Sequence, residues 1–169
     1  MIREADDRSR YPANWCWRDG PIVVGEVGIV DIDGVVADAY HRMQGIDRCS
    51  GNWADYFKNA GDDAVVEEIA RLLDLLTNEI AIVLLSARPL TIRDLTRDWL
   101  SRHSVRWDLM ILRSSPGVEK PLVFKRRTVR ELRDYGFIPQ LALEDDRRNV
   151  EMFHEEGIPC VYIHSGIHG

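Results

Sequence analysis

Apolar residues along the chain form short unbroken runs that are separated by segments with helical spacing. The runs at 27–31, 80–85, 109–112, 141–143 and 160–163 have the length and the aliphatic content of buried strands. A shorter run at 22–24 predicts an edge strand. Strands that alternate with helices in this way predict the α/β class, with a doubly wound parallel sheet.

The segments between these runs repeat apolar residues three and four positions apart, as amphipathic helices do. They predict one helix from an N-cap at Asp62 or Asp63 to about Asn78, one that begins at a capping-box-like Thr91 and Asp94, one from Pro121 to about Tyr135, and one that carries Val150 and Phe153 to Gly157.

Two parts of the chain lack this alternation. Residues 1–26 are expected to be an N-terminal extension of a domain at 27–169. Their aromatic residues are expected to pack on the core by default. The alternative is that they pack on a second copy of the chain, which would make the protein a homodimer. The irregular stretch at about 38–61 contains Gly45, Gly51 and Gly61, which argue against one long helix. A small insertion or cap is therefore expected after the first core strand, where it would choose the substrate.

Charge is distributed unevenly along the 169 residues. The net charge is −6, yet residues 88–133 carry 12 Lys and Arg against 5 Asp and Glu. A basic middle suits a phosphorylated or polyanionic substrate, and solvated helix faces are the alternative interpretation. No apolar run is long enough to span a membrane, and three widely spaced cysteines fit a reducing cytoplasm.

The first core strand ends in Asp31 and Asp33, and Gly34 follows as a sharp turn. Two carboxylates held close together repel each other unless a cation or a shared proton offsets the charge. The pair therefore favours a metal site, while an ordinary acidic turn remains the alternative.

Polar residues follow two further strands at the same predicted edge of the sheet. Ser86 ends the strand at 80–85, and Asp145 and Asp146 follow the strand at 141–143. Ligands bind at the carboxyl ends of strands in open α/β sheets, so these side chains are expected to lie close to Asp31 and Asp33.

Lys125 lies on the apolar stripe of its predicted helix, three residues after Leu122 and four before Val129. Burial of an ammonium group is costly without a partner, so an anion is expected beside it. The alternative is that Lys125 extends to solvent beside Arg126 and Arg127.

This set of residues suits phosphate chemistry. A carboxylate nucleophile can accept a phosphoryl group, and Mg²⁺ on carboxylate oxygens would offset the charge. Ser86, the backbone N–H after it and Lys125 can bind phosphate oxygens. Asp33 can supply a proton to the leaving oxygen and then accept one from water.

Four short motifs in this order resemble those of the haloacid-dehalogenase (HAD) superfamily of phosphohydrolases. They are Asp31-Ile32-Asp33-Gly34-Val35, Leu84-Leu85-Ser86-Ala87-Arg88, Lys125 and Asp145-Asp146.

The resemblance implies a HAD-like Rossmannoid core. It also implies that Asp31 is the nucleophile and a metal ligand, and that Asp33 is the general acid and base whose carbonyl also binds the metal. An acid of the last motif completes the metal site, with Asp146 as the first choice and Asp145 as the second. The implied phosphate and substrate ligands are Gly34, Ser86, Ala87, Arg88 and Lys125.

Within that superfamily the chain resembles the 3′-phosphatase domain of phage polynucleotide kinase, on Ser86-Ala87-Arg88, Arg97-Asp98-Trp99-Leu100 and Leu143 to Phe153. Ser-Ala-Arg replaces the family's Ser-Gly-Arg, and no GxxxxGK[ST] kinase loop occurs. The resemblance implies magnesium-dependent removal of 3′-phosphates from DNA or RNA ends. A nucleotidase or small-molecule phosphatase of the same fold is the alternative, and a receiver-type signalling domain is a remote one.

Overall fold

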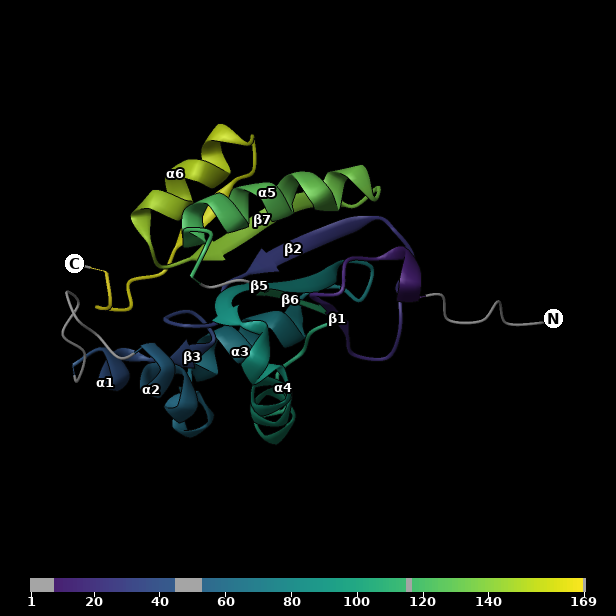
Figure 1. The fold of residues 1–169 in the computed structure, drawn as a ribbon. Coiled ribbons are helices and arrows are strands. Elements are labelled where there is room, and N and C mark those ends of the chain that lie inside the picture. The colour runs from purple at the N-terminus through teal and green to yellow at the C-terminus, as the bar shows by residue number, and fades with distance from the viewer. Residues whose placement is uncertain (1–7, 45–52, 115–116, 169) are drawn as a thin grey trace.

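The computed structural model describes residues 8–44, 53–114 and 117–168, and a six-stranded sheet lies at its centre (Figure 1). The strand order is β1-β6-β5-β2-β7-β8, and every neighbouring pair is parallel except β1 and β6. The strands are β1 (Trp15–Trp17), β2 (Glu26–Val30), β5 (Ala81–Pro89), β6 (Leu109–Arg113), β7 (Ile138–Glu144) and β8 (Cys160–Tyr162).

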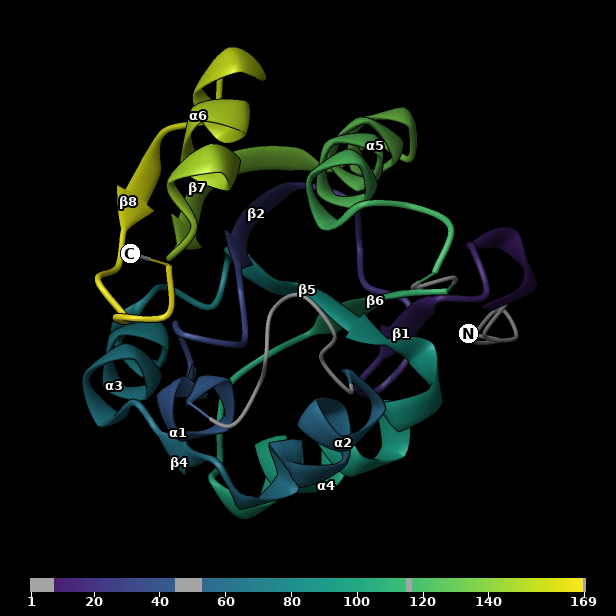
Figure 2. The same cartoon turned by 60° about the vertical axis from the view of Figure 1, so that its left-hand side comes forward.

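Helices cover both faces of this sheet. On one face lie α5 (Pro121–Asp134) and α6 (Arg147–Glu155), and on the other lie α3 (Glu67–Leu75) and α4 (Arg93–Arg102) (Figures 1 and 2). The central strand shows why: Val27 and Ile29 pack in the apolar cluster of α5 and α6, whereas Val30 packs in the cluster that holds Leu73 and Trp99. This arrangement confirms the predicted doubly wound, mostly parallel sheet.

The edge of the sheet differs from the prediction. Residues 22–24 belong to no strand, and β1 at Trp15–Trp17 forms the antiparallel edge beside β6 instead. The rings of Trp15 and Trp17 pack against Phe137, with centroids 6.0 and 6.3 Å apart. Burial of aromatic surface from a distant segment therefore selects the edge strand, and part of the predicted N-terminal extension joins the central sheet.

Two of the predicted helix starts, at Asp62 or Asp63 and at Thr91, are wrong in detail. Helix α3 begins at Glu67, its N-cap is Val66, and no side chain caps it. The predicted cap Asp63 instead accepts a hydrogen bond from Arg42. A short 3₁₀ turn, η3 (Leu90–Ile92), contains Thr91, and α4 begins only at Arg93. Tertiary ion pairs at Asp63 and the bend after β5 override these local capping signals.

The predicted small cap lies between two short paired strands, β3 (Ala37–Asp38) and β4 (Ala64–Val65). The described part of the cap contains α1 (Tyr40–Met43), α2 (Trp53–Lys58) and the 3₁₀ turn η2 (Asn59–Asp62), while positions 45–52 of the predicted insertion lie outside the described residues. Figure 1 shows α1 and α2 at the same end of the molecule as the arrowhead of β2. Another short 3₁₀ turn, η1 (Arg8–Arg10), precedes β1. Across the described ranges, no helix is both long enough and apolar enough to cross a bilayer.

Candidate active site

Most of the polar residues that were predicted to converge line one pocket of about 910 Å³, and Asp145 lies just outside its lining. Asp31 follows β2, Ser86 lies in β5, and β7 ends at Glu144, just before Asp145 and Asp146. Because these strands are parallel, their carboxyl ends meet at one edge of the sheet. The predicted site residues that line the pocket are Asp31, Asp33, Ser86, Ala87, Lys125 and Asp146.

Asp31 is buried beside the ammonium group of Lys125, with its Oδ2 atom 3.0 Å from Nζ. Its Oδ1 atom accepts the backbone N–H of Ile32 at 2.8 Å. Burial, together with the nearby carboxylate of Glu144, raises the pKa of Asp31 well above its ordinary value, although Lys125 opposes the shift. The site thus holds a carboxylate whose charge is poorly compensated.

Lys125 lies inside the protein, as its place on an apolar stripe predicts, and only 2% of it is exposed. Its Nζ atom donates to Glu144 Oε2 at 2.7 Å. Burial lowers the pKa of Lys125, but Asp31 and Glu144 outweigh that effect and raise it. The lysine is therefore a permanent cation between two carboxylates.

Glu144 is a site residue that the sequence interpretation missed. One of its carboxylate oxygens binds Lys125, and the other accepts the backbone N–H groups of Asp145 and Asp146 at 3.0 and 3.1 Å. Glu144 thereby holds both the lysine and the acidic loop in place. The sequence signal that could have identified Glu144 is the run of three acids, Glu144-Asp145-Asp146, at the end of a predicted strand.

Asp33 is bound by two arginines. Arg88 donates from Nη2 at 2.7 Å and from Nε at 3.1 Å, and Arg42 of α1 donates from Nη2. Burial raises the pKa of Asp33, but the charges and hydrogen bonds of Arg88 and Arg42 outweigh burial and hold it at about 2. Asp33 is therefore ionised in this arrangement.

The two arginines share a second carboxylate, Asp63, which the sequence interpretation also missed. Arg42 donates to both oxygens of Asp63, at 2.7 and 2.6 Å, and Arg88 donates to Oδ2 at 3.2 Å. Arg88 is completely buried and does not line the pocket, so the structure places it beneath Asp33 rather than against a substrate. No local sequence signal marks Arg42 and Asp63 as partners of Asp33 and Arg88, because the four residues come from four separate segments.

Asp145 has a buried oxygen with no partner. Its Oδ2 atom accepts the Ser165 hydroxyl at 2.6 Å, while Oδ1 has no hydrogen-bond partner among the described residues. Gly34 makes this approach possible, since a Cβ atom there would lie 2.0 Å from Asp145 Oδ2 and its φ is +84°. Burial raises the pKa of Asp145 to about 7.

Both carboxylate oxygens of Asp146 already have partners on Arg148. Asp146 is the N-cap of α6, accepts the backbone N–H of Arg148 at 2.9 Å and pairs with the guanidinium of Arg148 at 2.7 Å. Burial raises the pKa of Asp146, but Arg148 outweighs it and lowers the pKa. Ligand atoms of Asp31, Glu144 and Asp145 lie within 4.8 Å of one another, whereas Asp146 lines the pocket together with Asp31, so both acids of the last motif remain candidates for a metal site.

Arg113 is a further residue that the motifs did not reveal, after Glu144, Asp63 and Arg42. It ends β6 at the same sheet edge, lines the pocket and is 8% exposed. Its Nη1 atom donates to the Glu119 carbonyl at 2.9 Å, but its Nε atom is buried without a partner among the described residues. Burial lowers the pKa of Arg113, because the charged group is desolvated. A substrate anion would satisfy this guanidinium.

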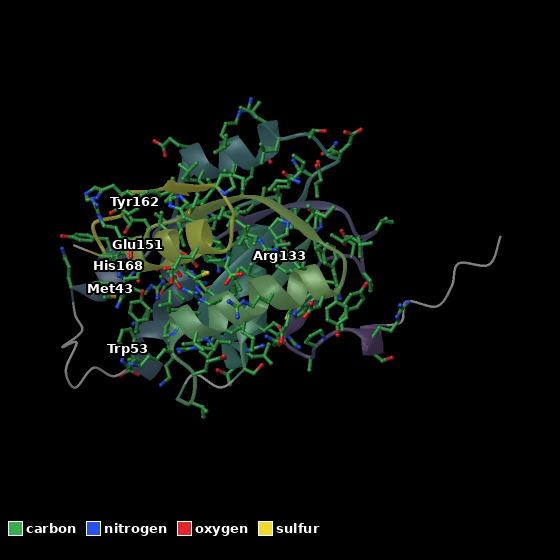
Figure 3. All side chains as sticks on the ribbon, turned by 90° about the horizontal axis from the view of Figure 1, so that it is seen from above. Met43, Trp53, Arg133, Glu151, Tyr162 and His168 are labelled. Atoms are coloured by element: carbon green, nitrogen blue, oxygen red, sulfur yellow. The ribbon has the colours of Figure 1, made fainter. Side chains whose placement is uncertain are left out.

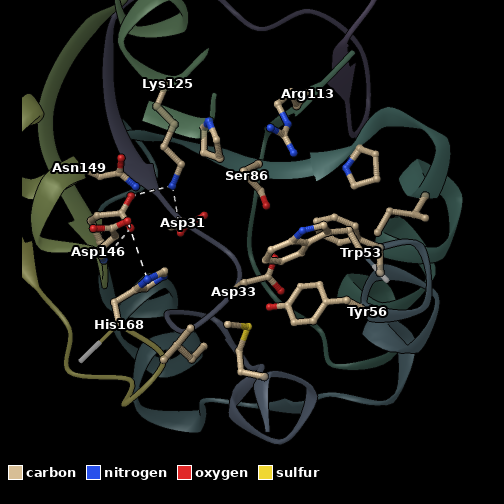
Figure 4. A pocket seen from close by; sticks show the side chains of 18 of the residues that line it. Asp31, Asp33, Trp53, Tyr56, Ser86, Arg113, Lys125, Asp146, Asn149 and His168 are labelled. Atoms are coloured by element: carbon tan, nitrogen blue, oxygen red, sulfur yellow. Dashed lines mark hydrogen bonds and ion pairs between the residues drawn. The ribbon is translucent and has the colours of Figure 1, made fainter. Parts of the chain in front are cut away.

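The cap and the C-terminal segment complete the pocket. Trp53, Tyr56 and Phe57 of α2 line it, as do Met43 and His168. Met43, Trp53 and His168 lie at the same end of the molecule (Figure 3). Figure 4 shows Trp53 and Tyr56 on the side opposite Lys125 and Asp146, with Asp31, Asp33 and Ser86 between them.

Residues 25–168 match a family model described as "Polynucleotide kinase PNKP phosphatase domain". Comparison with curated protein sequences gives no match.

Two similar solved structures carry the titles "Structure of the Pnkp1/Rnl/Hen1 RNA repair complex" and "Structure of Pnkp1/Rnl/Hen1 complex". They share 20% and 21% identity with this chain over 90% and 85% of its length, each with a TM-score of 0.68. The chain spans about half of those chains, 47% in both cases. At this identity the likeness concerns the fold.

Proposed function

The chain belongs to the family of polynucleotide kinase (PNKP) phosphatase domains and is a HAD-like phosphatase, and from this premise we propose that it removes 3′-phosphates from nucleic-acid ends. One observation carries the proposal: Asp31, Asp33, Ser86, Ala87, Lys125 and Asp146, which come from all four motifs, line a single pocket. Membership of a phosphatase family leaves no support for the receiver-type alternative.

Asp31 attacks the phosphorus, and the bond to the 3′ oxygen breaks to give an aspartyl-phosphate. The leaving oxygen takes a proton from Asp33. Water then attacks the phosphorus, Asp33 accepts the proton of that water, and the bond between phosphorus and the Asp31 oxygen breaks. Inorganic phosphate is released and the Asp31 carboxylate is restored.

Arg42 and Arg88 oppose the protonation that the first step needs, because they hold Asp33 ionised. We expect the dianionic phosphate to weaken this hold, since a nearby negative charge raises the pKa of a carboxyl group.

Ser86, the Ala87 N–H, Lys125 and Arg113 supply donors and positive charge for phosphate oxygens. These groups are fixed by the fold before substrate arrives, so they need little reorganisation during the reaction.

The donor set also fits Mg²⁺. Asp31 and Asp145 would hold the ion, together with the Asp33 carbonyl that the family resemblance implies, and the unpartnered Asp145 Oδ1 atom supports this choice. Magnesium would offset the negative charge of the nucleophile and of the phosphate.

A second candidate is hydrolysis of nucleoside 3′-monophosphates. The arginines of α5 are paired with glutamates: Arg127 with Glu119 and Glu131, and Arg130 and Arg133 with Glu156. Their charge is therefore largely neutralised, which favours a short substrate over a long polyanion.

Phosphate release from a substrate panel tests the proposal. A 3′-phosphorylated oligonucleotide, its 5′-phosphorylated isomer and a nucleoside 3′-monophosphate are compared in Mg²⁺, with Asp31→Asn as the blank. Preferred turnover of the 3′-phosphorylated oligonucleotide is expected. Activity on the mononucleotide alone would identify a nucleotidase, and activity on none would overturn the proposal.

A further inference from the structure

The pocket has an aromatic wall that phosphate chemistry does not use. Trp53 and Tyr56 of α2 lie on the side of the pocket that faces Asp31 and Asp146 (Figure 4), and Phe57 also lines the pocket. Tyr56 is buried, whereas Trp53 remains 48% exposed despite its large apolar ring. An exposed tryptophan on the wall of a reaction pocket offers a flat surface to whatever occupies that pocket.

The size of the pocket indicates that more than a phosphate enters it. Its volume of about 910 Å³ lies near the top of the range for pockets that bind whole small molecules. A phosphate is polar and gains nothing from tryptophan and phenylalanine. The group attached to the phosphate must therefore carry the apolar surface that these rings match.

The wall is held in a defined place relative to the reaction centre. The Trp53 ring meets Tyr56 edge-on at 5.5 Å and Phe57 at 6.4 Å. The guanidinium of Arg42 lies 4.2 Å from the Tyr56 ring centroid, and Arg42 also donates to the Tyr56 carbonyl at 3.1 Å. Because Arg42 binds Asp33, a chain of contacts connects the aromatic wall to the proposed acid/base.

Resting on the proposed function, we propose that Trp53 is the stacking platform for the base of the terminal nucleotide whose 3′-phosphate faces Asp31. Bases stack on aromatic side chains irrespective of their identity, since every base presents a π-face. A terminal base that enters this pocket to reach Trp53 must separate from its partner strand, because the pocket has the volume of one small molecule. The site therefore takes an unpaired terminal nucleotide and reads its base with little sequence preference.

Two 3′-phosphorylated oligonucleotides that differ only at the last position test this inference. One ends in a normal nucleotide, and the other ends in an abasic sugar. Wild type is expected to show the lower KM for the base-bearing end. Trp53→Ala should raise that KM by roughly tenfold, with kcat nearly unchanged, because stacking binds ground state and transition state alike.

The same variant should leave the KM for the abasic substrate unchanged, which also shows that it folds. Trp53→Phe should retain most of the preference for a base. Tyr40→Ala is the matched control, since Tyr40 is 45% exposed on the neighbouring helix α1 and does not line the pocket. It should behave as wild type.

Equal losses on both substrates, or no loss on either, would overturn the stacking role. An equal preference of wild type for the two ends would do the same. In each of these cases wild-type turnover of 3′-phosphorylated ends would still stand, so failure of this inference is distinguishable from failure of the proposed function.

Discussion

Asp31, the proposed nucleophile, carries a buried charge that costs stability. It is buried next to Glu144 and Asp145, and its raised pKa reports the cost of holding a negative charge there. Lys125 offsets part of that cost at 3.0 Å. A nucleophile needs this charge, whereas the fold would be at least as stable with a neutral side chain of the same shape.

Asp31→Asn should therefore separate activity from stability. We expect phosphatase activity to fall by more than roughly 10⁴-fold, as for removal of other nucleophiles. In metal-free buffer Tm should stay equal or rise, because a neutral amide replaces the poorly compensated carboxylate. Steady-state phosphate release and thermal unfolding measure the two effects, and a near-normal rate would refute the nucleophile assignment.

In the proposed metal site, Asp145 would make metal binding depend on pH. Its pKa of about 7 lies above the value of about 3.9 expected in the unfolded chain. The folded state thus binds the extra proton between these values, so this group lowers stability as pH rises from about 4 to about 7 in the absence of metal. A metal ion needs the ionised carboxylate and competes with that proton.

The increase in Tm caused by Mg²⁺ should accordingly be larger at pH 8 than at pH 5.5. Thermal unfolding with Mg²⁺ or with EDTA at each pH measures it. Asp145→Asn should reduce this pH dependence, and the part that remains is expected from Asp31, the other proposed ligand with a raised pKa. The same increase in Tm at both pH values would argue against Asp145 as a ligand.

At the scale of elements, the cap is tied to the core by buried charge. Arg42 comes from α1, Arg88 from β5 and Asp63 from the turn before β4, and all three are buried. Burial raises the pKa of Asp63, and Arg42 and Arg88 lower it. These ion pairs fix α1 and η2 beside Asp33, so the cap and the acid/base share one scaffold.

Asp63→Ala should destabilise the protein by about 3–5 kcal/mol, because two arginines would lose a buried counter-ion. Urea unfolding measures the free energy. Asp94→Ala is the control, since Asp94 pairs with Arg93 on the exposed surface and its loss should leave Tm unchanged. Equal effects of the two substitutions would show that the network does not hold the cap.

Over the whole molecule, the basic middle of the sequence does not become a basic face. Arg126, Arg130 and Arg133 of α5 meet the glutamates at 155 and 156, and Arg106 donates to backbone carbonyls at the end of α3. The arginines of α5 are therefore held in ion pairs within the chain. This supports the interpretation that the basic middle of the sequence forms solvated helix faces. The basic residues that line the pocket are Lys58, Arg113, Lys125 and Arg148.

The KM for oligonucleotides with a 3′-phosphate should consequently be nearly independent of oligonucleotide length beyond the first few nucleotides. The dependence of this KM on salt should be shallow, since few cations outside the pocket contact the strand. Measurements with strands of increasing length at two salt concentrations test this. A KM that falls steadily with length would reveal an extended nucleic-acid groove.

The sequence by itself determined the strands of the parallel sheet and the faces of the helices, and it placed Asp31, Asp33, Ser86, Lys125, Asp145 and Asp146 near one edge of that sheet. Those features follow from the periodicity of apolar residues, which is a local property of the sequence. They also follow from the topology, because parallel strands all end at one edge of a sheet. Only the tertiary structure decided the edge strand at Trp15–Trp17, the sharing of Arg42 and Arg88 between Asp33 and Asp63, and the unpartnered oxygen of Asp145. These depend on contacts between segments far apart in the chain, where burial and charge pairing override local propensity.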